Sequence, residues 1–214
     1  MENFKLPIGI YGITDSKSGK NKDLITYCEE LLKGGVKILQ YREKNKNIKE
    51  KIEEAIKLRE LTKKYNTLFI VNDHIDVALL SQADGIHIGQ DDIPVSYARK
   101  LLGNKKIIGL STHNKEQALK AIEDGVNYIG VGPIFNTETK VDVCAPVGFE
   151  YLNYVKNNTN IPFVAIGGIK ENNILSVLEN GATSIALVSE LVGNKDTLNK
   201  TKNINNLIHN FLSK

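Results

Sequence analysis

Two carboxylates and a row of cationic side chains are the residues of this sequence best suited to chemistry. Asp73 and Asp92 each follow a short apolar run, and Arg42 and Lys44 follow a third. Carboxylates that face cations across one mouth suit a hard divalent ion bridging acid oxygens and a polyphosphate. We expect Mg²⁺, because it needs few protein ligands and takes the others from water and phosphate.

Gln40, Arg42 and Lys44 stand at every second position at the end of an apolar run. This spacing puts three long polar side chains on one side of an extended segment. A strand buried in a core would not carry them, so a functional role is favoured over a structural one.

A second anion site is predicted where glycines and a serine follow the last two apolar runs. Gly167 and Gly168 follow one run, and Val188 and Ser189 end the other. Backbone N–H groups of such glycines, together with a helix N-terminus, commonly hold a phosphate in barrel proteins. We therefore expect a phosphate separate from the polyphosphate.

The acidic candidates also have structural interpretations. Asp92 precedes Ile93 and Pro94, so its carboxylate alone would be expected to cap a helix that begins there. The pair Asn72 and Asp73 is equally typical of a turn. Only their combination with the cationic row favours a site.

Two further polar segments are open to the same alternative. Asn114 with Gln117 is typical of a capping box, which would make Ser111 and His113 the approach to a helix. His87 lies within an apolar run, where a hydrogen-bonded interior histidine is expected more often than a ligand.

The elements that must position these residues alternate along the chain, with short apolar runs followed by segments of helical periodicity. Such runs indicate parallel strands buried on both faces. Glycines that end helices before a strand, at Gly35, Gly125 and Gly181, mark a repeated unit. Eight units of about 27 residues predict a (β/α)₈ TIM barrel as a single domain over residues 1–214; a doubly wound open sheet is the alternative. The eight runs are Ile8 to Ile13, Val36 to Tyr41, Leu68 to Val71, Gly85 to Ile88, Ile107 to Leu110, Tyr128 to Val131, Phe163 to Ile166, and Ser184 to Val188.

Composition narrows the functional classes. The net charge is +3, but lysines alternate with glutamates as on a solvated helix face, so a nucleic-acid partner is the minor alternative. No apolar run approaches the roughly 20 residues of a membrane helix. The chain begins without a secretory signal pattern, and Cys28 and Cys144 do not suggest a disulfide framework. We expect a cytoplasmic protein that acts on small molecules; the sequence does not decide between a monomer and a homo-oligomer.

With these residues identified, the sequence resembles the thiamine phosphate synthase family (thiamine-phosphate pyrophosphorylases) over roughly nine tenths of its length. Single matches such as AIGGI are weak, whereas QxRxK, ND, GQxD and GPxFxTxTK in this order are specific. The matching stretches are YGITD at 11–15, QYREK at 40–44, VNDH at 71–74, ADGIHIGQDD at 83–92, GLSTH at 109–113, YIGVGPIFNTETK at 128–140, AIGGI at 165–169 and ALVSEL at 186–191.

The resemblance implies a Mg²⁺-assisted transferase. It would join 4-amino-2-methyl-5-hydroxymethylpyrimidine diphosphate to 4-methyl-5-(2-phosphoethyl)thiazole, releasing diphosphate and forming thiamine phosphate. The residue chemistry agrees, since the thiazole nitrogen is itself the nucleophile and no Ser-His or Cys-His pair is evident. By resemblance, Asp73 and Asp92 bind the metal. The sequence leaves open how metal ligation is divided between Asp92 and its neighbour Asp91. The groups around the pyrimidine diphosphate would be Gln40, Arg42, Lys44, Asn72 and Lys140, with Ser111 on the aminopyrimidine; the thiazole phosphate would meet Thr137, Thr139, Gly168, Val188 and Ser189.

Three alternatives remain beside this assignment. A thiazole tautomerase-like paralogue would share the barrel and the phosphate site, but the retained QxRxK, Asp73, Asp92 and Lys140 argue against it. A non-catalytic thiazole-phosphate-binding protein and a nucleic-acid binder would release no diphosphate. The loop from Pro133 to Pro146 is expected to act as a lid that delivers Lys140 to the leaving group, because loops of such length are usually functional.

Overall fold

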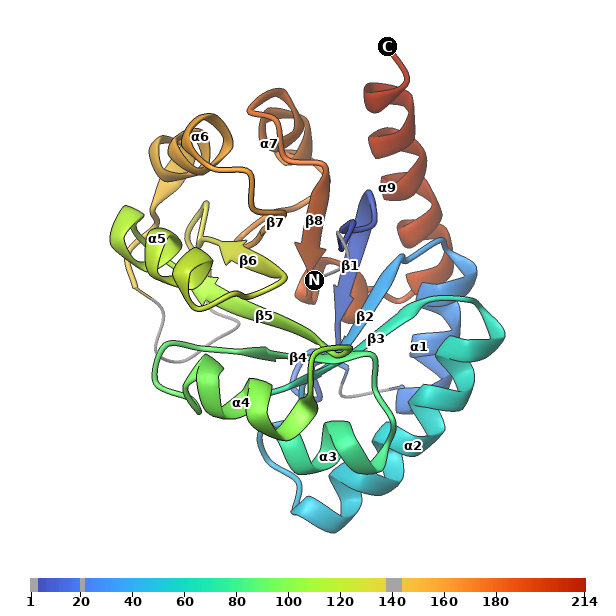
Figure 1. Cartoon of the computed structure of the whole chain (residues 1–214). Helices are drawn as coiled ribbons and strands as arrows, with labels where there is room; N and C mark the ends of the chain where they lie inside the picture. The colour runs from blue at the N-terminus through green and yellow to red at the C-terminus, as the bar shows by residue number, and fades with distance from the viewer. Residues whose placement is uncertain (1–3, 20–21, 138–143) are drawn as a thin grey trace.

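The eight expected strands pair in chain order into one closed parallel barrel, in which β8 pairs back onto β1 (Figure 1). The computed structural model describes residues 4–19, 22–137 and 144–214. The predicted (β/α)₈ barrel is confirmed, and the open-sheet alternative is wrong. The strands are β1 Gly9–Ile13, β2 Ile38–Tyr41, β3 Leu68–Asn72, β4 Gly85–Ile88, β5 Ile107–Thr112, β6 Tyr128–Val131, β7 Phe163–Ala165 and β8 Ser184–Leu187.

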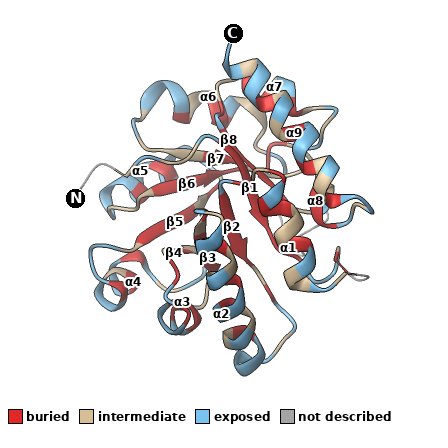
Figure 2. Cartoon of the chain, turned by 90° about the vertical axis from the view of Figure 1, so that its right-hand side faces the viewer, coloured by how far each residue is buried: buried red, intermediate tan, exposed pale blue. Residues whose placement is uncertain are grey.

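Helices follow the strands and cover the outside of the barrel (Figure 2), with buried residues toward the strands and exposed residues outward. The last segment of the chain forms α9, which buries Ile204 and Ile208. No helix in the described part of the chain is long and apolar enough to cross a membrane. The helices are α1 Leu24–Lys33, α2 Ile48–Lys64, α3 Ile75–Leu80, α4 Val95–Leu102, α5 Lys115–Glu123, α6 Gly148–Asn158, α7 Ile174–Glu179, α8 Ser189–Val192 and α9 Thr197–Leu212.

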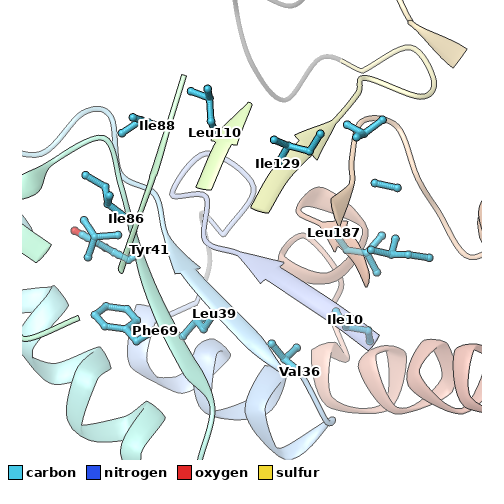
Figure 3. Close-up of a cluster of buried hydrophobic side chains, with 14 of the residues drawn as sticks. Ile10, Val36, Leu39, Tyr41, Phe69, Ile86, Ile88, Leu110, Ile129 and Leu187 are labelled. Carbon is cyan, nitrogen blue, oxygen red and sulfur yellow. The ribbon is translucent and has the colours of Figure 1, made fainter. Parts of the chain in front are cut away.

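Two apolar layers hold the barrel together. The larger one lies between strands and helices, where side chains such as Ile10, Leu39 and Phe69 are fully buried (Figure 3). The smaller one fills the barrel interior and includes Ile38 and Tyr128. Because strand side chains alternate between the two faces, every strand except β4 contributes to both layers, which explains the continuous apolar runs of the sequence.

The glycines and side-chain caps that the sequence predicts at helix ends are present, with one exception. Gly35, Gly125 and Gly181 have φ of 100°, 74° and 92°, as predicted for glycines that end helices. The predicted cap at Asn114 is also present, since its side chain accepts a hydrogen bond from the Gln117 backbone N–H at 2.9 Å.

The alternative interpretation of Asp92 as a helix cap is wrong. Helix α4 begins at Val95, Pro94 is its N-cap residue, and no side chain caps it. The Asp92 carboxylate instead accepts a hydrogen bond from the Gly89 backbone N–H at 2.6 Å, within its own loop. This bond leaves the carboxylate beside β4, at the rim of the barrel.

An ion pair ties helix α2 to the loop before β4. Arg59 donates two hydrogen bonds to the Asp84 carboxylate at 2.7 and 2.8 Å, and Asp84 also accepts from the Phe69 backbone N–H at 2.8 Å. Both charged side chains are mostly shielded from solvent. A bidentate, shielded ion pair of this kind holds the helix and the loop together more firmly than an exposed pair would.

We predict that Asp84→Ala lowers the free energy of unfolding by roughly 1.5–3 kcal/mol, because it removes charged hydrogen bonds and leaves Arg59 without its partner. Urea denaturation followed by circular dichroism measures the change. Glu60→Ala is the matched control, since it breaks only the exposed pair with Lys63 and should not move the urea midpoint. Equal midpoints for both variants would contradict the assignment.

Candidate active site

A cavity of about 1260 Å³ opens at the carboxyl ends of the barrel strands. It is the place where barrel enzymes carry their chemistry. Eleven of the thirteen candidate residues line it, and the other two, Thr139 and Lys140, lie outside the described residues, as do residues 138–143 of the loop expected to form a lid. The eleven are Gln40, Arg42, Lys44, Asn72, Asp73, Asp92, Ser111, Thr137, Gly168, Val188 and Ser189.

One corner of the cavity is acidic. Asp73 directly follows β3 in a left-handed conformation, with φ of 59°, and its backbone N–H donates to the His87 carbonyl oxygen. Lys44 donates to the Asp73 carboxylate at 2.5 Å. Partial burial raises the pKa of Asp92 above its ordinary value, and the neighbouring Asp73 carboxylate raises it further, while the hydrogen bond from Gly89 opposes the rise. The two carboxylates are therefore close enough to repel one another.

This corner fits a small divalent cation held by few protein ligands. Burial is the main cause of the raised pKa of Asp92, and a cation between Asp73 and Asp92 would relieve the repulsion that adds to it. No cluster of three or more His, Cys, Asp or Glu side chains among residues 4–19, 22–137 and 144–214 is arranged to hold a metal. A site of two carboxylates suits Mg²⁺, which keeps water and substrate phosphate in its other positions.

The end of β2 supplies the cationic wall. The Thr14 side chain fixes the backbone at this strand end. Its hydroxyl donates to the Arg42 carbonyl oxygen at 3.0 Å and accepts from the Arg42 backbone N–H at 2.8 Å. The Arg42 guanidinium lies 3.6 Å from the buried Asp15 carboxylate. Asp15, which is not among the candidate residues, lies beside Arg42, where it restrains the guanidinium.

The wall across from the acidic corner is made by β7 and β8. Gly167 and Gly168 have φ of 100° and 64°, conformations that favour glycine. Ser189 is the first residue of α8, so its backbone N–H has no acceptor within the helix. Gly168 also has no room for a side chain, because a Cβ there would overlap the Asn136 carbonyl oxygen. The loop after β6 thus packs directly on the glycines.

The floor of the cavity is a chain of hydrogen bonds inside the barrel. The Gln40 amide Nε2 donates to the Tyr11 hydroxyl at 2.7 Å, and Tyr11 and Tyr128 hydroxyls lie 2.8 Å apart. His87 contacts the Tyr128 hydroxyl through Nδ1 at 3.0 Å and the Ser111 hydroxyl through Nε2 at 2.9 Å. His87 is thus the hydrogen-bonded interior histidine that was expected, and it also lines the cavity.

Sequence reasoning did not single out the two tyrosines of this floor. Burial raises the pKa of both Tyr11 and Tyr128, so both remain neutral hydroxyls. A signal was present, since a tyrosine within a doubly buried strand must find a hydrogen-bond partner inside the barrel. The partner was not deducible, because it lies on a strand far along the chain.

Comparisons with known proteins agree on one family. The sequence profile described as thiamine monophosphate synthase matches residues 10–191. The thiamine-phosphate synthase of Pelotomaculum thermopropionicum is 51% identical over 203 residues, covering 95% of this chain and 93% of the relative. That of Lawsonia intracellularis is 51% identical over 187 residues, covering 87% and 86%.

A solved structure leads to the same family. Thiamine phosphate pyrophosphorylase from Pyrococcus furiosus superposes with a TM-score of 0.88 at 35% identity, covering 96% of this chain and 97% of that one. A 3-hexulose-6-phosphate synthase, with a TM-score of 0.66 and 15% identity, shares the fold alone. On the profile, the relatives and the structure together, the chain belongs to the thiamine monophosphate synthase family.

Proposed function

We propose that this enzyme joins 4-amino-2-methyl-5-hydroxymethylpyrimidine diphosphate to 4-methyl-5-(2-phosphoethyl)thiazole, forming thiamine phosphate and diphosphate. The observation that carries the proposal is one cavity with an acidic and cationic wall on one side and a glycine-rich anion site on the other. Two phosphate-bearing substrates need two such sites. The named relatives, about half identical in sequence, support the same reaction.

The acidic corner and β2 would hold the pyrimidine diphosphate. Asp73 and Asp92 would bind Mg²⁺, which when bound neutralises charge on the leaving diphosphate. Arg42 and Lys44 add fixed positive charge there, and Asn72, the last residue of β3, lines the cavity next to Asp73. Lys140, outside the described residues, is proposed from the family motif as a further cation for the diphosphate.

The thiazole phosphate would bind at the other wall. Backbone N–H groups near Gly168 and Ser189 are suited to its phosphate, and Val188 and Thr137 line the space beside them. Thr139 completes the set by motif only, since it lies outside the described residues.

The arrangement suits a substitution in which bond breaking leads. The bond between the pyrimidine methylene carbon and the diphosphate oxygen breaks, and its electron pair leaves with diphosphate. The electron-rich aminopyrimidine stabilises the methylene cation, and the thiazole nitrogen then donates its lone pair to form the new carbon–nitrogen bond. No protein nucleophile is required; the side chains align the substrates and neutralise the leaving group. A single assay that follows thiamine phosphate and diphosphate together, with both substrates and Mg²⁺, tests the proposal.

For the metal site, we predict that Asp73→Ala and Asp92→Ala each lower kcat/KM by roughly 100-fold or more, since loss of the cation removes charge stabilisation of the leaving group. Steady-state rates across a Mg²⁺ titration measure the effect. The variant Asp91→Ala distinguishes the two neighbouring acids. Asp91 lines the cavity, but Asp92 is the residue that lies beside Asp73. We therefore expect Asp91→Ala to keep most of the activity. Full activity of both other variants in excess EDTA would overturn the metal assignment.

For the phosphate site, bulky substitution of Gly168 is not a clean test, because any side chain there would displace the loop at Asn136. Ser189 is exposed, so it tolerates change. We predict that Ser189→Asp raises the KM of the thiazole phosphate at least about tenfold by repulsion between anions, with little change in the KM of the pyrimidine diphosphate. Ser189→Asn is the control of equal size without charge. A similar rise for both substrates would argue against this site.

A further inference from the structure

The hydrogen-bonded floor of the cavity has a defined direction. It begins at Gln40 on β2 and ends at Ser111 on β5, and both of these residues line the cavity. Between them lie Tyr11, Tyr128 and His87, from three other strands. Each neighbouring pair lies within 2.7 to 3.0 Å, so the proton position at one link decides the next.

The direction follows from the first link. An amide nitrogen is only a donor, so the Gln40 amide Nε2 makes the Tyr11 oxygen an acceptor. The Tyr11 hydroxyl then donates its own proton to the Tyr128 oxygen, and Tyr128 donates in turn to Nδ1 of His87. Since Nδ1 accepts, a neutral His87 carries its proton on Nε2.

The opposite direction would leave a buried proton without an acceptor. If Tyr128 donated to Tyr11, the Tyr11 oxygen would accept two hydrogen bonds, one from Tyr128 and one from Gln40. Its own O–H would then have no recorded partner among the described residues, at a side chain that is only 1% exposed. An unsatisfied buried hydroxyl is unfavourable enough to decide the direction.

We propose that His87 is a positioning residue that turns the Ser111 hydroxyl proton into the cavity, so that Ser111 donates a hydrogen bond to a ring nitrogen of the aminopyrimidine. The Nε2–H of His87 donates to the Ser111 oxygen at 2.9 Å, which leaves the serine proton to point toward the ligand. This inference rests on the proposed function. A donor at a ring nitrogen withdraws electron density from the ring, so the contact aids binding rather than cation formation.

The variants His87→Asn and His87→Gln test the roles of the two imidazole nitrogens one at a time. An asparagine amide falls near the position of Nδ1 and does not reach Ser111, whereas a glutamine amide can place an N–H near the position of Nε2. We expect His87→Asn to raise the KM of the pyrimidine diphosphate about 5- to 10-fold, as loss of one hydrogen bond does, with kcat nearly unchanged. His87→Gln should stay within about 2-fold of wild type, and neither should alter the KM of the thiazole phosphate.

A double-mutant cycle then tests whether His87 acts through Ser111. In a Ser111→Ala background, His87→Asn should have no further effect on the KM of the pyrimidine diphosphate, because the group that it positions is gone. Additive effects, or equal losses in His87→Asn and His87→Gln, would show a structural role and overturn the proposal.

The tautomer can be measured without either substrate. In ligand-free protein labelled with ¹⁵N-histidine, the His87 resonances, assigned by their loss in His87→Gln, should report a proton on Nε2. Tyr128→Phe should weaken this preference, because it removes the donor to Nδ1. A wild-type His87 protonated mainly on Nδ1 would overturn the direction of the chain. A wild-type enzyme that forms no thiamine phosphate would instead refute the proposed function and leave the tautomer result standing.

Discussion

Closure of the parallel sheet is the constraint on which the rest of the structure depends. An open parallel sheet exposes two edges, and pairing of β8 with β1 removes both. Closure also brings the carboxyl ends of all strands to one rim, so residues as distant in sequence as Gln40 and Ser189 line one cavity. The site therefore results from topology first and from local sequence second.

The polar floor beneath that rim is compatible with a buried barrel only because neighbouring strands leave room for it. Gly109 on β5 faces Tyr128, and a Cβ at this position would overlap the tyrosine ring. At Gly130 on β6 a Cβ would lie 3.4 Å from Cε1 of His87. Small residues on β5 and β6 thus accommodate the large hydrogen-bonding side chains of β4 and β6. Apolar residues at both positions would fill the space and separate His87 from Ser111.

The sequence predicted what depends on periodicity and on strand ends. Continuous apolar runs predicted all eight strands to within two residues at every end, and the family motifs led to the family that the comparisons confirm. It could not predict contacts that depend on which strands face one another. Asp92 illustrates the limit, because the carboxylate before Ile93 and Pro94 had the local pattern of a helix cap, and only the loop geometry directs it to Gly89. Tyr11 and Tyr128 illustrate it again, since their pairing crosses the barrel.

The placement of the two anion sites follows from the same closure. In a barrel whose strands are paired in order from β1 to β8, β3 and β4 lie across from β7 and β8. Asp73 and Asp92 lie on the first side, and Gly168 and Ser189 on the second. Two substrates that each carry phosphate repel one another, and the repulsion falls as their charged groups are separated. Binding these groups at opposite walls keeps them apart while the rings that must react extend toward the centre. There the floor of Tyr11, Tyr128 and Gln40 is uncharged, so in the proposed reaction the developing cation meets hydroxyl and amide dipoles, and the full charges stay at the walls.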